Sequence, residues 1–144
     1  MNTNKKTNIF LVDDDEMYLK LLEVQLAENT TYHLRKFTTG EECLEHLVEK
    51  PDIIILDYYL NSIEQKALDG LETLRKIKLQ YPELPVIMLS SQDKIDVAVN
   101  CMKLNAFDYI VKSETAIPRL NKAIANLIQQ NTIAKTLRWY IDKL

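Results

Sequence analysis

The alternation of short apolar runs with longer, helically spaced segments constrains the fold of this chain more than any other feature of its sequence. Apolar runs occur at about residues 9–12, 34–37, 53–56, 85–89 and 107–111. Each is followed by a segment whose apolar residues recur every three or four positions, at about residues 15–28, 40–50, 68–81, 94–104 and from 115 onward. This alternation is typical of parallel strands connected by crossover helices. The sequence therefore predicts an α/β chain of five strand–helix units.

Chain length separates the two common parallel architectures. A closed barrel of eight units needs about 250 residues, whereas this chain has 144. Strands that are apolar throughout indicate a sheet covered by helices on both faces. We therefore expect one domain built on an open, doubly wound parallel sheet, in which ligands bind at the carboxyl ends of the strands.

Composition excludes several classes of function. The two glycines, Gly40 and Gly70, lie far apart, whereas a dinucleotide fingerprint or a P-loop needs closely spaced glycines. The chain contains neither an HExxH zinc motif nor a GxSxG nucleophile elbow. Its formal net charge of −3 at pH 7 argues against direct binding of nucleic acid.

The cysteines and the amino-terminal sequence bear on cellular location. Cys43 and Cys101 are isolated thiols, and the first residues lack the long apolar segment of a signal peptide. No apolar run approaches the roughly 18 residues of a membrane span. We therefore expect a cytoplasmic protein without membrane association. Cys43 and His46, three residues apart, supply at most two metal ligands, so we expect no metal site there.

Polar residues follow four of the expected strands. Taken singly, each has an ordinary structural explanation: an aspartate opening a helix is a common cap, which is the role expected for Asp15. Taken together, they converge on one crevice, because the carboxyl ends of parallel strands share one edge of the sheet. The set comprises Asp13, Asp14 and Asp15 after the first strand, Asp57 after the third, Ser90 and Ser91 after the fourth, and Lys112 after the fifth.

Converging carboxylates require a cation. Two carboxylates about 4 Å apart repel by about 4 kcal/mol at an effective dielectric constant of 20. An oxygen-only ligand set favours Mg²⁺, which commonly binds carboxylates together with phosphoryl oxygens. A carboxylate such as Asp57 can act as a nucleophile toward phosphorus, while Lys112 and Ser90 have the right chemistry to bind phosphoryl oxygens.

Over about residues 7–130 the chain resembles the CheY-like receiver domain of two-component response regulators. The resemblance rests on the segments IFLVDDDE, IIILDYYL, LDGLETLRKIK, PVIMLSS and FDYIVK. It implies a flavodoxin-like sheet with strand order 2-1-3-4-5, and a function as a phosphorylation-dependent switch that alters protein contacts. The implied phosphodonor is a sensor histidine kinase or a phosphotransfer protein, and no downstream target is identified.

The resemblance also implies a role for each site residue. Asp57 matches the phosphoacceptor, and Mg²⁺ would be held by Asp13, Asp14, Asp57 and the backbone carbonyl of Tyr59. Ser90 matches the hydroxyl that turns toward the phosphoryl group, and Lys112 matches its basic partner. Tyr109 matches the aromatic switch residue, although an aromatic at this position can equally be static core. A bulky Tyr59 suggests slow hydrolysis of the phosphorylated form.

Two local features depart from the family pattern. Ser113 follows Lys112 where receivers usually have a proline after a cis peptide bond, which leaves the geometry of this turn open. The segment 58–68, between Asp57 and the Asp69-Gly70 pair, is about five residues longer than is common. It either gates the site or meets a partner, or it is a plain surface insertion.

The carboxyl terminus is a third departure. Residues 131–144 extend beyond the expected receiver domain as a helical segment whose apolar residues need a partner. This extension could pack back on its own domain, form a homodimer, or begin a linker to an output domain.

Two rival functions share some of these features. A haloacid-dehalogenase-type phosphatase also uses aspartate, serine, lysine and Mg²⁺, but its DxD motif is followed by glycine and threonine, whereas Glu16 and Met17 follow here. A pseudo-receiver would keep the fold without phosphoryl transfer, and the missing proline and the longer loop are its only support.

Overall fold

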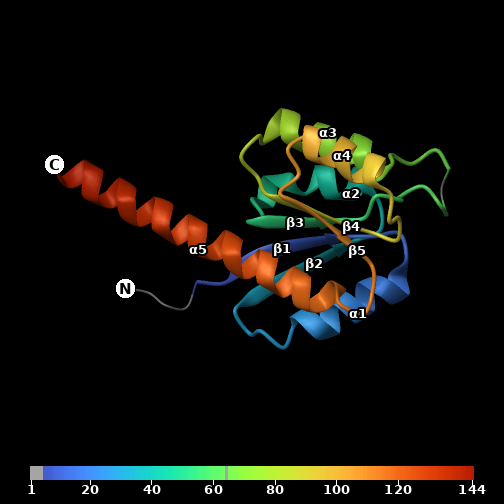
Figure 1. The fold of residues 1–144 in the computed structure, drawn as a ribbon, viewed down its shortest axis with the longest axis horizontal. Coiled ribbons are helices and arrows are strands. Elements are labelled where there is room, and N and C mark those ends of the chain that lie inside the picture. Colours follow the sequence, from blue (N-terminus) through green and yellow to red (C-terminus); the bar gives the residue numbers. More distant parts are fainter. Residues whose placement is uncertain (1–4, 64) are drawn as a thin grey trace.

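The computed structural model describes residues 5–63 and 65–144. A five-stranded parallel sheet with order β2-β1-β3-β4-β5 forms its centre (Figure 1). The strands are β1 (Thr7–Val12), β2 (Tyr32–Phe37), β3 (Ile53–Leu56), β4 (Val86–Ser90) and β5 (Asp108–Val111). The helices are α1 (Glu16–Leu26), α2 (Gly40–Glu45), the short 3₁₀ helix η1 (Leu47–Glu49), α3 (Gly70–Gln80), α4 (Ile95–Lys103) and α5 (Ala116–Lys143). The expected doubly wound fold and strand order are confirmed.

Helices cover the sheet on both faces: α1 and α5 lie on one side, and α2, α3 and α4 lie on the other (Figure 1). Side chains alternate between the two faces along each central strand. In β1, for example, Ile9 and Leu11 pack toward α1 and α5, whereas Phe10 and Val12 pack toward α2 and α3. This double coverage explains why β1, β3 and β4 read as continuous apolar runs rather than as alternating ones.

The helix boundaries follow from capping residues. Asp15 caps α1 as expected, with its carboxylate accepting from the backbone N–H groups of Met17 and Tyr18. Asp69 caps α3 by accepting from Glu72 N–H, so this helix begins at Gly70 rather than at residue 68. Leu68 therefore precedes the helix.

The expected single helix over residues 40–50 is wrong. Helix α2 ends at Glu45, and the chain continues through the 3₁₀ turn η1 to Lys50, which adopts a left-handed conformation with φ of 57°. Pro51 cannot continue a helix, and the tighter 3₁₀ turn lets the chain leave toward β3 while Leu47 stays buried.

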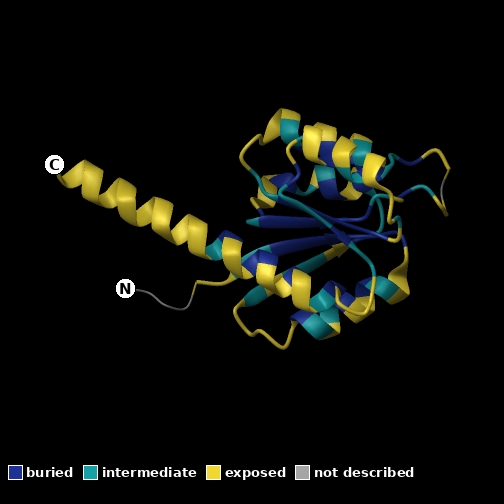
Figure 2. Ribbon diagram, viewed as in Figure 1, coloured by how far each residue is buried: buried dark blue, intermediate teal, exposed yellow. Residues whose placement is uncertain are grey.

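Helix α5 runs without interruption from the domain into the extension. Its first half buries Leu120, Ile124 and Leu127 against the sheet, as the sequence predicts. Residues 129–144 are all exposed, and Figure 2 shows this part of α5 projecting away from the domain. Packing of the extension back onto its own domain, one of the alternatives open from the sequence, is not what this structure has.

Within the described part of the chain, no helix is both long enough and apolar enough to cross a membrane.

Candidate functional site

Backbone pairing holds the polar residues at one edge of the sheet. The N–H of Asp57 donates to the carbonyl of Val12 at 2.9 Å, and the N–H of Lys112 donates to the carbonyl of Ser90 at 2.7 Å. The sheet ladder therefore continues one residue beyond the ends of β3 and β5. As a result, the side chains of Asp57 and Lys112 start from fixed backbone positions.

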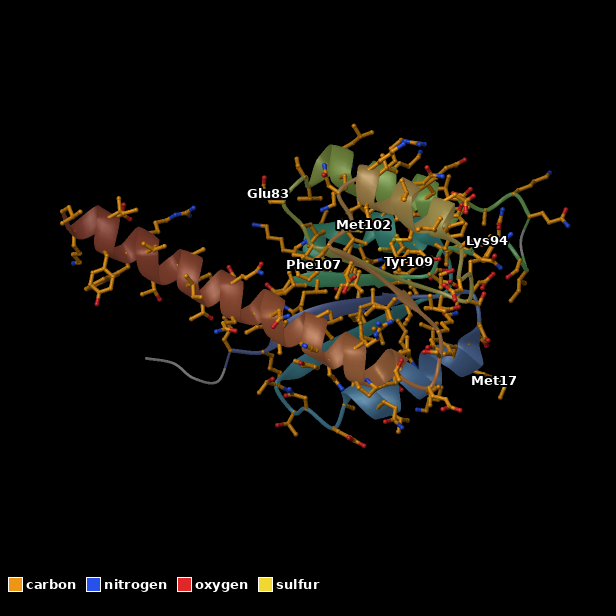
Figure 3. All side chains as sticks on the ribbon, viewed as in Figure 1. Met17, Glu83, Lys94, Met102, Phe107 and Tyr109 are labelled. Carbon is orange, nitrogen blue, oxygen red and sulfur yellow. The ribbon has the colours of Figure 1, made fainter. Side chains whose placement is uncertain are left out.

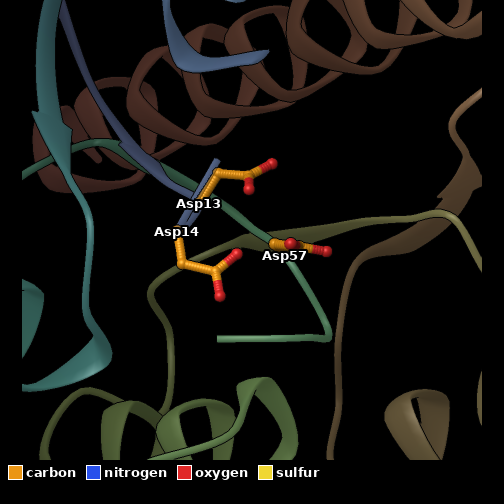
Figure 4. Close-up of side chains that lie close together, drawn as sticks. All are labelled: Asp13, Asp14 and Asp57. Carbon is orange, nitrogen blue, oxygen red and sulfur yellow. The ribbon is translucent and has the colours of Figure 1, made fainter. Parts of the chain in front are cut away.

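Three carboxylates meet at this edge. Asp13 and Asp14 follow β1 and Asp57 follows β3, and each offers an oxygen within 4.8 Å of the other two (Figure 4). The three residues are only 2%, 8% and 5% exposed. Such crowding of buried carboxylates is unfavourable unless positive charge compensates it.

Lys112 supplies part of that charge. Its Nζ lies 2.7 Å from Asp13 Oδ2 and 3.5 Å from Asp57 Oδ2. The same ammonium lies 4.2 Å from the centre of the Tyr18 ring. Burial alone would lower the pKa of Lys112, but the hydrogen bond to Asp13 and the charge of Asp57 outweigh burial and raise it. Lys112 is therefore a fixed positive charge in the site.

The negative charge of Asp57 is only partly compensated by Lys112. Burial, followed by the charge of Asp13, raises its pKa from 3.8 to about 7, and the charge of Lys112 opposes this only in part. Its Oδ1 is buried without a hydrogen-bond partner. A buried acceptor of this kind normally has a partner, so Asp57 Oδ1 is available to interact with a bound cation.

These observations fit a hard divalent cation. The cluster offers only oxygen ligands and has more negative than positive charge, with Lys112 as the ammonium among three carboxylates. Oxygen ligands of this type suit Mg²⁺. The unpartnered Asp57 Oδ1 is the acceptor that such an ion would satisfy.

Comparison with known proteins identifies the family. The family model of the response regulator receiver domain matches residues 9–125. The chain belongs to this family.

Individual relatives agree with this assignment. The DNA-binding transcriptional regulator NtrC of Escherichia coli K12 is 33% identical over 126 residues, which are 85% of this chain and 26% of that protein. The transcriptional regulatory protein ZraR of Klebsiella oxytoca is 31% identical over 110 residues, 76% of this chain and 24% of that protein. The receiver domain therefore spans about a quarter of the length of these curated relatives.

Solved receiver structures have the same fold. The receiver domain of NtrX from Brucella abortus is 30% identical and aligns with a TM-score of 0.74, covering 84% of this chain and 98% of that one. Five parallel strands in the order 2-1-3-4-5 are thus both the observed architecture and that of the family.

Ser90 and Tyr109 of the receiver are connected through the β4–α4 loop. The N–H of Gln92 donates to Ser90 Oγ at 3.1 Å, and the Tyr109 hydroxyl donates to the carbonyl of Gln92 at 2.7 Å. Tyr109 lies on β5 and packs against the core cluster between the sheet and helices α3 and α4 (Figure 3). Burial raises the pKa of its hydroxyl, so the group remains a donor at neutral pH. Gln92 has no recognisable sequence signal, because only its backbone makes these contacts.

Other candidates behave differently. The side chain of Tyr59 is 38% exposed and stacks edge-to-face on Tyr58, and its carbonyl stays a predicted ligand. The Lys112–Ser113 peptide bond is trans. Cys43 is buried, which raises the pKa of its thiol to about 12, and His46 Nδ1 lies 2.8 Å from the Glu42 carbonyl. Neither residue belongs to the acidic cluster that could hold a metal ion among the described residues.

Two residues contact the site without having been predicted. The ring of Tyr18 on α1 lies against Lys112. Ser62, from the long β3–α3 loop, donates to Asp14 Oδ2 from both its N–H, at 3.1 Å, and its hydroxyl. The length of segment 58–68 and its position after Asp57 indicated a loop over the site, but not which of its residues makes the contact.

Proposed function

We propose that this receiver domain is a phosphoacceptor switch in which Asp57 takes a phosphoryl group from a phosphohistidine. The observation that carries the proposal is the position of Lys112 Nζ, 2.7 Å from Asp13 and 3.5 Å from Asp57, at the edge where three buried carboxylates meet. One ammonium and one cation-binding set of oxygens flank a single nucleophilic carboxylate, as phosphoryl transfer to an aspartate requires.

The chemistry at Asp57 is a displacement at phosphorus. A carboxylate oxygen of Asp57 attacks, a P–O bond forms, the P–N bond of the donor breaks, and the donor histidine leaves with a proton taken from solvent. Hydrolysis later returns the carboxylate and releases inorganic phosphate as water attacks phosphorus. Between these two steps Asp57 carries the phosphoryl group as an acyl phosphate, so the phosphorylated protein itself stores the signal.

The metal would be held by Asp13, Asp14, Asp57 and the Tyr59 carbonyl. When bound, Mg²⁺ supplies positive charge that neutralises phosphoryl oxygens. Asp13 also holds two of its neighbours in position. Its Oδ1 accepts a hydrogen bond from the Asp15 N–H at 2.9 Å, and its Oδ2 accepts one from Lys112.

Lys112 and Ser90 would bind the phosphoryl oxygens that the metal leaves free. The pKa of Lys112 is raised, so it stays protonated and can move its ammonium from Asp13 and Asp57 to a phosphoryl oxygen. Ser90 is fully buried, and its Oγ accepts from Gln92 N–H, which leaves its own hydroxyl proton to donate to phosphate.

Ser90 and Tyr109 would couple the site to the protein surface. Movement of Ser90 toward phosphate would alter its bond to Gln92, whose carbonyl holds the Tyr109 hydroxyl. A two-state rearrangement of this loop would change the surface of α4, β5 and α5.

The partners and boundaries form part of the same proposal. A sensor histidine kinase or a phosphotransfer protein would be the phosphodonor, in the cytoplasm, and the output would be protein contact rather than direct binding of nucleic acid. Residues 7–130 would form the receiver, and residues 131–144 would form a helical extension that takes part in association, for example as a homodimer.

Intact-mass spectrometry tests the proposal. Wild type, Asp57→Asn and the control Asp93→Asn are incubated with Mg²⁺ and acetyl phosphate, and Asp93 is an exposed acid outside the cluster. We expect an adduct of one phosphoryl group on wild type and on Asp93→Asn but not on Asp57→Asn, and its loss on brief treatment with hydroxylamine. Absence of the adduct from wild type would favour a pseudo-receiver.

A further inference from the structure

Ser62 lies on the long β3–α3 loop and reaches back to a residue of the acidic cluster from 48 positions away in the chain. Its backbone N–H and its hydroxyl both donate to the same oxygen, Oδ2 of Asp14. Asp14 is buried, with 8% of its surface exposed. The two donors therefore act inside the site, where hydrogen bonds to a charged group are strong.

Two donors on one oxygen fix the orientation of the carboxylate. A carboxylate oxygen has two lone pairs, and both lone pairs of Asp14 Oδ2 are used by Ser62. Rotation of the carboxylate about its terminal torsion would break both bonds, so Oδ1 is left as the oxygen that faces a cation. Ligating carboxylates are commonly held in this way, and loss of the outer partner typically weakens metal binding by about 10- to 100-fold.

The loop brings Ser62 to Asp14 from two firm attachments. Leu60, two residues before Ser62, is 1% exposed and belongs to the core cluster under α3. At the other end, the N–H of Gly70 donates to the Tyr58 carbonyl at 2.9 Å, and the Leu68 N–H donates to Glu41. These contacts fix the two ends of the segment that carries Ser62.

Ser62 adds no charge to the acidic cluster. It contributes hydrogen-bond donors and no positive charge, so it does not neutralise the cluster that attracts the ion. The contact therefore supports the metal site rather than filling it.

We propose that Ser62 is a positioning residue for the metal site: it orients Asp14 for Mg²⁺, so that Mg²⁺ binding and the contact between Ser62 and Asp14 strengthen each other. The inference rests on the proposed function, because it needs Mg²⁺ to bind the acidic cluster. Coupling is reciprocal, so Mg²⁺ must stabilise the contact between Ser62 and Asp14 to the same extent that this contact strengthens Mg²⁺ binding.

Calorimetric titration with Mg²⁺ measures how much Ser62 strengthens Mg²⁺ binding. We expect Ser62→Ala to weaken Mg²⁺ binding by about 10-fold, the low end of the usual range, because the backbone N–H of residue 62 remains. Ser62→Thr keeps the hydroxyl and restores binding to within about twofold. Ser113→Ala, a serine whose Oγ contacts Thr115 instead, is the matched control and leaves binding unchanged.

Limited trypsin digestion measures how much Mg²⁺ stabilises the segment that carries Ser62, and it does not depend on phosphorylation. Lys66 lies in the same loop, and Lys135 lies on the exposed extension. We expect Mg²⁺ to slow cleavage after Lys66 in wild type, to slow it less in Ser62→Ala, and to leave cleavage after Lys135 unchanged in both.

The outcomes separate the two proposals. If wild type binds no Mg²⁺, the proposed metal site itself is wrong, and Ser62 has no role in it. If wild type binds Mg²⁺ but Ser62→Ala binds it equally well, with Lys66 insensitive to the ion, the positioning role is wrong while the proposed function stands. Tighter binding by a folded Ser62→Ala, checked by circular dichroism, would show that the loop competes with the cation and would also overturn the inference.

Discussion

The hydroxyl of Tyr109 donates a 2.7 Å hydrogen bond to the backbone carbonyl of Gln92, two residues beyond Ser90. This bond joins β5 to the loop that leaves β4, on the side of the sheet covered by α3 and α4. Tyr109 is therefore attached to the segment that would move if Ser90 turned toward a phosphoryl group.

Removal of this hydroxyl gives the first prediction. Tyr109→Phe keeps the ring in its packing position but leaves the Gln92 carbonyl without its donor. We expect the free energy of unfolding to fall by about 1 kcal/mol, the usual net value of one hydrogen bond, as measured by urea denaturation. Tyr81→Phe, at a partly exposed tyrosine, serves as control and changes stability by less than about 0.5 kcal/mol. Equal stability of the two variants would contradict the role given to the Tyr109 hydroxyl.

Gly70 gives a prediction about the backbone beneath Asp57. A Cβ atom at this position would lie 2.2 Å from the Asp57 carbonyl oxygen and 2.6 Å from Tyr58 Cα. Both neighbours are backbone atoms and cannot rotate away, so we expect Gly70→Ala to destabilise the fold by about 2–3 kcal/mol and to weaken Mg²⁺ binding.

Gly40→Ala is the comparison for this variant. Its Cβ would lie 2.1 Å from Thr73 Oγ1, which is a side-chain atom. Thr73 can give way by leaving its bond to the Asp69 carbonyl, so the loss of stability should be smaller than for Gly70→Ala. Chemical denaturation of both variants measures the two losses in the free energy of unfolding. A larger loss for Gly40→Ala than for Gly70→Ala would show that the backbone after β3 adapts more easily than its contacts indicate.

Tyr18 gives a prediction about Lys112. The Lys112 ammonium lies 4.2 Å from the centre of the Tyr18 ring, and such contacts contribute about 0.5–2 kcal/mol. We expect Tyr18→Leu to slow phosphorylation by acetyl phosphate about 3- to 10-fold, because Lys112 loses one of the groups that hold it near Asp57. Tyr18→Phe retains the ring and should react within about twofold of wild type. A large loss in Tyr18→Phe would instead assign the effect to the hydroxyl.

Asp57 gives a prediction about pH. Its pKa rises from 3.8 to about 7 on folding, so between these values the folded protein binds more protons than the unfolded chain. The free energy of unfolding of the metal-free protein therefore falls as pH rises through this window, by at most about 1.4 kcal/mol per pH unit from this residue. Asp57→Asn lacks this dependence. Measured by urea denaturation in EDTA, the free energy of unfolding of Asp57→Asn should therefore increase relative to that of wild type from pH 4.5 to pH 7.

Saturating Mg²⁺ is the control for the pH experiment. Bound cation favours the charged carboxylate and should reduce the difference between wild type and Asp57→Asn at pH 7. Parallel stability curves for the two proteins in EDTA would mean that burial of Asp57 is compensated in some other way.

The sheet and its polar edge could be predicted because both depend on periodic or local signals. Each central strand is a continuous apolar run that ends in a polar residue, and parallel pairing then forces Asp13, Asp57 and Lys112 to the same edge. The cap at Asp15 follows from residue type alone.

The remaining contacts depend on irregular backbone, for which the sequence has no periodic signal. Gln92 acts through its main chain, and the contact of Ser62 with Asp14 depends on the irregular course of the chain after β3. The end of α2 has no periodic signal either: Pro51 predicts a helix that stops before it, but the change to a 3₁₀ turn at Leu47 depends on how that residue packs.

Because α5 is uninterrupted, a change in its direction at the domain would be transmitted to the end of the extension. The helix begins four residues after Lys112, and residues 129–143 project from the domain as rigid helix over about 22 Å at 1.5 Å per residue. If this part of α5 tilted by about 10°, the far end of the helix would move by about 4 Å, which is more than the rise of about 1.5 Å per residue. A small displacement at Lys112 that tilted α5 would therefore be larger at Trp139 and Tyr140, whose rings are exposed near the far end of the helix.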